Sequence, residues 1–215
     1  TNAKKWDDPY ENWFMKSKIV YKNKEYSFEN YIGSIIGCCW SLKSESDALW
    51  RIYSPDKKGI RISTNISLLY QEFVMNQDKK TFNNLYGGKV LYKSIKEMSN
   101  ILSKVNPQLA LIKPETISRN TSFIKRTAFS HENEYRLLLV DKKYVNIDYY
   151  PIGINPNNLI TSICFDPRMS KTDEKSYESI IRKIGYTGKI VKSKMYDFEP
   201  VLAGVNWMKN SEKDV

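Results

Sequence analysis

Residues 134–140 read Glu-Tyr-Arg-Leu-Leu-Leu-Val, a stretch that predicts a β-strand whose apolar end, residues 137–140, is buried. Glu132 stands just before it, separated from Glu134 by one residue. If the chain is extended from Glu132 onward, Glu132, Glu134 and Arg136 project from one face at spacings of about 7 Å. Charges this close to a core are costly unless they are paired. The pattern therefore indicates either an edge strand laced by neighbouring lysines or a functional site.

The surrounding segments mix the two periodicities of secondary structure. We expect helices at 66–74, 95–105 and 177–184, a turn at Gly87-Gly88, and strands at 32–40, 59–63, 89–92, 144–147, 159–165 and 189–194. Strands outnumber helices and do not alternate strictly with them, which predicts an α+β fold with a central mixed, mostly antiparallel sheet flanked by helices. At 215 residues we expect a single domain over residues 1–205 and a polar tail at 206–215.

Composition narrows the classes of protein that this chain can represent. It has 34 Lys plus Arg against 24 Asp plus Glu, a formal charge of +10, and the apolar content of a globular protein. No apolar run of about 18 residues and no secretory signal are present, so we expect a cytoplasmic protein without a membrane partner. The basic charge leaves nucleic-acid binding open, although scattered lysines supply most of it.

Cysteine and histidine are scarce. Three cysteines cannot form a disulfide framework, and the apolar run around Cys38 and Cys39 predicts buried thiols. His131 is the single histidine, so a zinc site built on several histidines is impossible. A general-base role for His131 stays open.

A second group of side chains suits a cleft. Ser41 follows the predicted strand 32–40, a position from which a hydroxyl can enter a cleft. Trp50 and Tyr53 are three residues apart and share one face of a short predicted helix, which we expect to face inward. Core packing and ligand stacking are both consistent with this pair.

The order and spacing of several short motifs resemble a known bacterial family. The motifs are Asp8-Pro9-Tyr10-Glu11, Cys39-Trp40-Ser41, Glu45-Ser46, Leu49-Trp50-x-x-Tyr53, Lys125 and Phe129-x-x-Glu132-x-Glu134-x-Arg136. The family is catalogued as domain-of-unknown-function family 2971, and the likeness runs from about Trp6 to Phe165. Its members usually carry a further β-rich segment before the Asp-Pro motif, so Thr1 is expected to be an internal residue of a longer protein.

More distantly, the arrangement resembles ADP-ribosyltransferases, although their Arg, His or Tyr from an early strand has no counterpart here. The resemblance implies NAD as the substrate, a glutamate beside its nicotinamide ribose as an oxocarbenium ion develops, a supporting serine, and aromatic side chains on the nicotinamide. Preorganised negative charge beside a developing cation lowers the barrier. The expected activity is ADP-ribosyl transfer or NAD glycohydrolysis in a toxin or anti-phage setting, with an unidentified protein acceptor or partner.

The residues expected to carry this activity come from the motifs. The expected catalytic residues are Glu134, which is preferred, Glu132 and Ser41; the expected substrate-binding residues are Trp50, Tyr53, Lys125, Arg136, Ser46, Asp8 and Glu11. No metal is expected.

Two alternatives stay open. The carboxylates Asp8, Glu11, Glu132 and Glu134 could hold Mg²⁺ beside a phosphodiester, with Lys125 on the scissile phosphate, which would make a nuclease. A non-catalytic module that senses a nucleotide or a phage component could instead grip a phosphate and a base with the cations and the indole of the same set.

Overall fold

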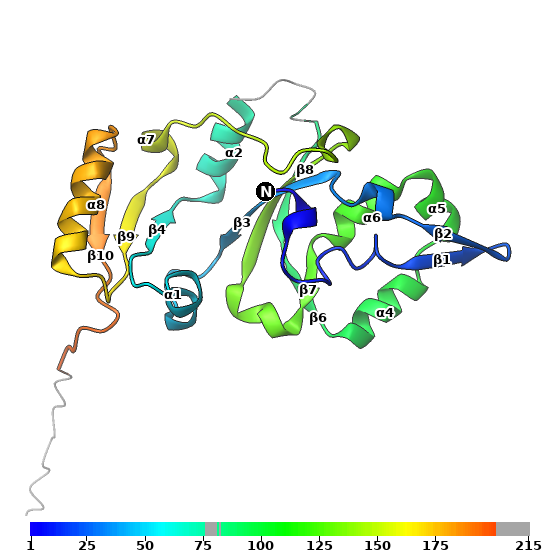
Figure 1. Ribbon diagram of the computed structural model, residues 1–215, viewed down its shortest axis with the longest axis horizontal. Helices are drawn as coiled ribbons and strands as arrows, with labels where there is room; N and C mark the ends of the chain where they lie inside the picture. The colour runs from blue at the N-terminus through cyan, green and yellow to red at the C-terminus, as the bar shows by residue number, and fades with distance from the viewer. Residues whose placement is uncertain (76–80, 82, 201–215) are drawn as a thin grey trace, which may run out of the picture.

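The computed structural model describes residues 1–75, 81 and 83–200, and the strands of these residues form four small sheets (Figure 1). The central sheet is antiparallel and has the order β3-β8-β5. A second sheet has the order β10-β9-β4, in which β10 is parallel and β4 antiparallel to β9. The remaining two are the antiparallel hairpin β1-β2 and the parallel pair β6-β7.

The strand bounds are β1 Lys18–Tyr21, β2 Lys24–Ser27, β3 Ile35–Ser41, β4 Ile60–Ser63, β5 Leu85–Lys89, β6 Leu91–Lys93, β7 Ile124–Arg126, β8 Glu134–Val140, β9 Ser162–Phe165 and β10 Lys189–Lys192. The α-helices are α1 Asp47–Tyr53, α2 Ile66–Met75, α4 Ile95–Ser103, α5 Pro107–Ile112, α6 Pro114–Thr121, α7 Pro156–Leu159 and α8 Lys171–Lys183. Short 3₁₀ helices are η1 Ala3–Lys5, η2 Glu29–Tyr31, η3 Thr127–Glu132 and η4 Lys142–Tyr144.

The α+β prediction with mostly antiparallel strands is confirmed. Figure 1 shows α8 beside β9 and β10 at one end of the molecule, the β1-β2 hairpin with α4 and α5 at the other, and β3 and β8 between them. Within the described ranges, no helix has the length and apolar character needed to cross a bilayer. The predicted polar tail at 206–215 lies outside the described residues.

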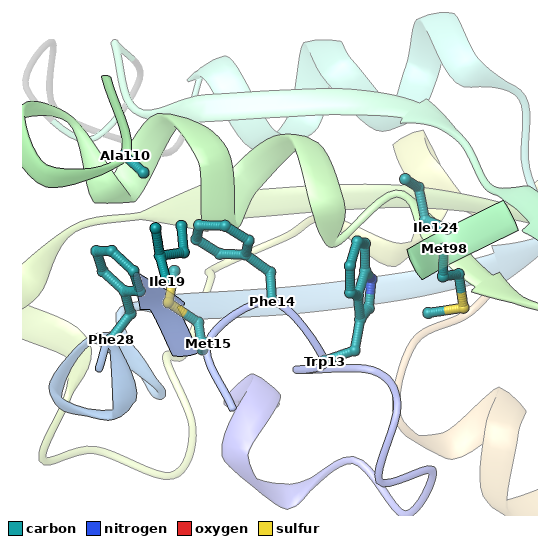
Figure 2. Packing of buried hydrophobic residues seen from close by; sticks show 8 residues of the cluster. All are labelled: Trp13, Phe14, Met15, Ile19, Phe28, Met98, Ala110 and Ile124. Carbon is teal, nitrogen blue, oxygen red and sulfur yellow. The ribbon is translucent and has the colours of Figure 1, made fainter. Parts of the chain in front are cut away.

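One hydrophobic cluster fixes the position of the N-terminal residues (Figure 2). Phe14 stacks on Phe28 with ring centroids 5.4 Å apart, and Trp13 meets Phe14 edge to face. Met98 of α4 and Ile124 of β7 belong to the same cluster. Because Trp13 follows Glu11 closely and Ile124 directly precedes Lys125, burial of this apolar surface also brings Glu11 and Lys125 together.

Two local predictions are wrong. The pair Gly87-Gly88 lies inside β5 and not in a turn. A Cβ atom at Gly87 would fall 1.7 Å from the Tyr70 hydroxyl and 2.8 Å from the Tyr135 hydroxyl. Glycine is needed there for the close approach of two phenols. Residues 144–147 are not a strand either, since Tyr144 ends the 3₁₀ helix η4 and is buried.

Replacing Gly87 with alanine should lower the free energy of unfolding by about 1–3 kcal/mol, because the added methyl group must displace the two packed phenols. Gly153→Ala is the matched control, since nothing lies within 4 Å of a Cβ atom at that position. Urea denaturation of both variants measures the difference. Equal stability of the two variants would show that Tyr70 and Tyr135 move aside freely.

Candidate functional site

Three buried carboxylates surround the ammonium group of Lys125 on β7. Its Nζ lies 2.5 Å from Glu132 Oε2, 2.7 Å from Glu134 Oε1 and 3.1 Å from Glu11 Oε1. All four side chains are at most 10% exposed. Ion pairs withdrawn from water to this degree persist only when geometry and hydrogen bonding compensate desolvation, and here each carboxylate meets the same cation.

Arg136 is the second cation of this cluster. Its Nη1 and Nη2 donate to the two oxygens of Glu11 at 2.7 and 2.9 Å, its Nε donates to Glu134 Oε2 at 2.8 Å, and Nη1 also reaches the Ser122 carbonyl. The side chain is 1% exposed and its guanidinium lies over the Trp6 ring. Every guanidinium nitrogen is thus engaged inside the protein, and Arg136 positions Glu11 and Glu134.

Local backbone geometry explains how Glu132 joins this cluster. Glu134 and Arg136 are alternate residues of β8 and share a face, as predicted. Glu132 is not on that strand, which corrects the extended reading of 132–136: it ends the 3₁₀ helix η3, and Asn133 follows in the left-handed conformation with φ 46°. This one residue turns the chain so that both glutamates reach Lys125.

A cleft of about 1100 Å³ opens beside the cluster. It runs between the edge of β3, helix α1 and strand β4, and its walls include Trp6, Trp40 and Phe129. Six acidic and five basic side chains line it, in a chain of net charge +10. All the residues predicted for the site line this cleft: Glu134, Glu132, Ser41, Trp50, Tyr53, Lys125, Arg136, Ser46, Asp8 and Glu11.

Glu132 lies nearest the helix that borders the cleft. The hydroxyl of Tyr53 on α1 donates to Glu132 Oε1 at 2.9 Å, and Tyr53 is 67% exposed, so the prediction that it faces inward is wrong. The Ser41 hydroxyl donates to the Glu132 main-chain carbonyl at 2.7 Å. Ser41 therefore supports Glu132, through its backbone and not through its carboxylate.

The other predicted residues hold the walls of the cleft. Trp50 is buried, and its indole nitrogen donates to Glu45 at 2.9 Å, which makes it a packing residue of α1. Asp8 is buried and accepts two hydrogen bonds from Arg126. Ser46 is the N-cap residue of α1 and lines the cleft.

Two further cleft residues were not predicted. Arg61 of β4 and Lys43 also line the cleft. Arg61 was recognisable as an arginine in a period-two strand, whereas no sequence signal distinguished Lys43 from the many other lysines. His131 does not line the cleft and stacks with Phe129.

Burial and neighbouring charges shift the pKa values of the two glutamates of the Glu-x-Glu pair in opposite directions. Burial, and then the neighbouring Glu134 carboxylate, raise the pKa of Glu132 above its ordinary value of 4.5. Burial also acts to raise the pKa of Glu134, but hydrogen bonds from Glu132 and Arg136 and the nearby cations lower it well below that value. Burial and the hydrogen bond to Glu132 raise the pKa of Tyr53 to about 12. Glu134 is the fixed anion of the pair, and Glu132 is the acid of the pair that binds a proton more readily.

The cluster contains its own counter-ions. In the part of the chain that the structure describes, no group of three or more His, Cys, Asp or Glu side chains is arranged to hold a metal ion. The Lys125 ammonium occupies the point on which Glu11, Glu132 and Glu134 converge. Three of the four carboxylates suggested for Mg²⁺ in a nuclease therefore already share an internal cation, and the fourth, Asp8, pairs with Arg126.

The cysteine prediction needs one correction. Cys38 is half-buried, whereas Cys39 is exposed and lines the cleft on the same strand face as Ser41. Burial therefore ends within β3: residues 35–37 are buried, whereas Cys39 can be reached from the cleft.

Comparison with known proteins supports the family resemblance. The family model described as "Protein of unknown function (DUF2971)" matches residues 49–137, a narrower range than the likeness predicted from Trp6 to Phe165. The matched segment includes Lys125, both glutamates of the pair and Arg136. No curated protein and no solved structure matches the chain.

Arg136→Met should lower the free energy of unfolding by about 3–5 kcal/mol, because it leaves Glu11 and Glu134 buried with less than their full counter-charge. Lys18→Met is the control, since the pair of Lys18 with Glu25 is exposed and its loss should change little. Chemical denaturation measures both. A small effect at Arg136 would mean that water enters and solvates the two carboxylates.

Carbon-13 NMR of the glutamate carboxyl groups should show Glu132 titrating above pH 4.5 and Glu134 staying ionised well below it. The Tyr53 hydrogen bond lowers the pKa of Glu132, so Tyr53→Phe should move the Glu132 midpoint to higher pH. Tyr21→Phe is the control, because the Tyr21 hydroxyl bonds Gln108, away from the site. A Glu132 midpoint below the ordinary value would contradict this assignment.

Proposed function

We propose that the protein is an enzyme that cleaves the N-glycosidic bond of NAD and transfers ADP-ribose to water or to a protein acceptor. The observation that carries the proposal is the Glu132 carboxyl group in the cleft, with Tyr53 on one oxygen, Lys125 on the other and Ser41 on its backbone. The distant resemblance to ADP-ribosyltransferases, which also combine a glutamate, a serine and aromatic side chains, supports the same chemistry.

The charge of the cleft favours a substrate with a cationic group. The cluster of Glu11, Glu132, Glu134, Lys125 and Arg136 has three acids and two bases, so it carries an excess of negative charge when every group is ionised. As the bond from ribose to nicotinamide breaks, its electron pair passes to the nicotinamide nitrogen and the ribose becomes an oxocarbenium ion. A fixed anion beside that ion stabilises the transition state.

Glu132 is the residue that we assign to proton transfer. Water, or an acceptor nucleophile, attacks the ribose carbon and gives its proton to the ionised Glu132, so that NAD and water yield nicotinamide, ADP-ribose and a proton. The raised pKa of Glu132 makes it a stronger base than an ordinary carboxylate. Glu134 is engaged on both oxygens by Lys125 and Arg136, and it acts as a positioning residue. This assignment reverses the preference for Glu134 drawn from the sequence.

The pyrophosphate of NAD needs cations that are free to reach it. Arg136, one of the expected substrate-binding residues, is occupied by Glu11, Glu134 and the Ser122 carbonyl. Lys43 lines the cleft and is exposed, so it suits a phosphate. Arg61 also lines the cleft and is partly exposed, but it donates to the Ser44 carbonyl and would have to exchange that partner for a phosphate. Trp40 and Phe129 offer aromatic surface to the rings.

Incubation with NAD should release nicotinamide, and Glu132→Gln should reduce the rate by about 10²–10⁴-fold, the usual contribution of a general base. Because ionised Glu132 is required, the wild-type rate should rise with pH through its raised pKa. Glu25→Gln makes the same chemical change in the exposed hairpin and should leave the rate unchanged.

Two results would overturn the proposal. Cleavage of RNA or DNA that requires a divalent metal and stops with EDTA would identify a nuclease. A rise in melting temperature with NAD, but no nicotinamide release at any pH, would identify a nucleotide-binding module.

A further inference from the structure

Helix α1 lies between β9 and β8 (Figure 1), and one of its side chains reaches the cluster around Lys125. The Tyr53 hydroxyl donates to Glu132, whereas the other side-chain hydrogen bonds that α1 forms with described residues lead away from that cluster. Tyr53 is largely exposed, so the packing of its own ring holds it only weakly. Its position therefore depends on how the rest of α1 is anchored.

The N-terminal end of α1 is attached to the segment that follows β10. The Ser193 hydroxyl donates to Glu45, just before the helix, and the Tyr196 hydroxyl donates to Asp47, the first residue of α1. Asp47 is more than one helical turn away from Tyr53. The C-terminal end of α1, where Tyr53 lies, is fixed by other groups.

Arg168, in the loop between β9 and α8, holds that C-terminal end. Its Nη2 donates to the main-chain carbonyls of Trp50 and Ser54, both at 2.9 Å. A cation is favourable at the C-terminal end of a helix, where it can bond the last carbonyls and meets the negative end of the helix dipole. Ser54 directly follows Tyr53, so the two carbonyls lie on either side of Tyr53 in the chain.

Asp166 fixes the orientation of Arg168. The Nε and Nη2 atoms of Arg168 donate to the two carboxylate oxygens of Asp166 at 2.9 and 2.6 Å. Asp166 is fully buried, and its main-chain N–H donates to the Gly59 carbonyl beside β4. Burial acts to raise the pKa of Asp166, but hydrogen bonds from Arg168 and Ser54 lower it to about 2. The pair therefore stays ionised where Glu132, whose pKa is raised above 4.5, titrates.

We infer that Arg168 is a positioning residue of the site: it holds the C-terminal end of α1 so that the Tyr53 hydroxyl meets Glu132. The hydrogen bonds of Arg168 with described residues reach α1 and Asp166, so it acts on Glu132 through α1. The inference deepens the proposed function, and its consequence for the reaction rate rests on that function. The other ionisable groups around Glu132 are Lys125 of β7, Glu134 and Arg136 of β8, Tyr92 of β6, and Glu11.

Carbon-13 NMR of the Glu132 carboxyl group, in the whole protein without NAD, tests the inference. Arg168→Gln should raise the Glu132 midpoint by about 0.5 pH unit or more, because a loosened Tyr53 hydrogen bond stabilises the ionised carboxylate less. Arg182→Gln is the matched control and should leave the midpoint unchanged. Arg182 also donates to two main-chain carbonyls, but these lie between α8 and β10.

A double-mutant cycle separates positioning from a direct effect of charge. In the Tyr53→Phe protein, Arg168→Gln should cause no further shift of the Glu132 midpoint, because the hydrogen bond through which it acts is already lost. Gly59→Ala disturbs the same end of α1 without changing any charge, since a Cβ atom at Gly59 would fall 2.5 Å from the Ser54 Cβ atom. It should raise the midpoint as well.

A folded Arg168→Gln variant with the wild-type Glu132 midpoint, or with the same shift in the presence and absence of Tyr53, overturns the inference. If that variant does not fold, Arg168→Lys takes its place. Lysine keeps the charge but lacks the fork that joins both carbonyls to Asp166, so the midpoint should again rise, and an unchanged midpoint overturns the inference.

The rate of nicotinamide release tests the consequence for the reaction. In Arg168→Gln, the pH at which this rate rises should move upward together with the Glu132 midpoint. Absence of nicotinamide release from the wild-type protein would overturn the proposed function, whereas the NMR result would still decide the role of Arg168.

Discussion

The site depends on one ammonium group shared by three carboxylates. Lys125 draws Glu11 from the N-terminal segment, Glu132 from a 3₁₀ helix and Glu134 from the central strand to one buried point. None of these acids could remain ionised there alone, because transfer of a charge out of water costs more than the fold can supply. The hydrophobic cluster that contains Phe14 and Ile124 holds two of the contributing segments in place.

Charge in the cluster is unevenly matched, and the imbalance falls on one residue. Arg136 and Lys125 together neutralise Glu11 and Glu134, whose oxygens they contact directly. Glu132 has Lys125 on one oxygen and only the neutral Tyr53 hydroxyl on the other. Of the two glutamates of the Glu-x-Glu pair, it is therefore the one that binds a proton more readily. The residue with the weakest electrostatic support is the one beside an exposed aromatic hydroxyl of the cleft.

The sequence predicted which residues form the site better than it predicted the role of each residue within it. Alternation along 134–140 correctly placed Glu134 and Arg136 on one face, and motif order correctly selected residues that line one cleft. Periodicity could not show that Arg136 would be enclosed by Glu11, a contact between residues 125 positions apart. It also read Gly87-Gly88 as a turn, because the phenols that require glycine there come from Tyr70 and Tyr135, far away in sequence. Local patterns report faces and ends of elements, whereas partners depend on packing between distant segments.

Asn133 has a consequence for how this arrangement would be recognised in other chains. Two acids separated by one residue usually share a face only if the backbone is extended, yet here the intervening residue has φ 46° and the first acid precedes the strand. Asparagine, aspartate and glycine accept this backbone conformation easily, whereas valine, isoleucine and threonine resist it. The sequence motif is therefore three residues long: an acid, a residue that tolerates left-handed backbone geometry, and a second acid. A β-branched amino acid in the centre would swing the leading carboxylate away from its lysine, even with both acids intact.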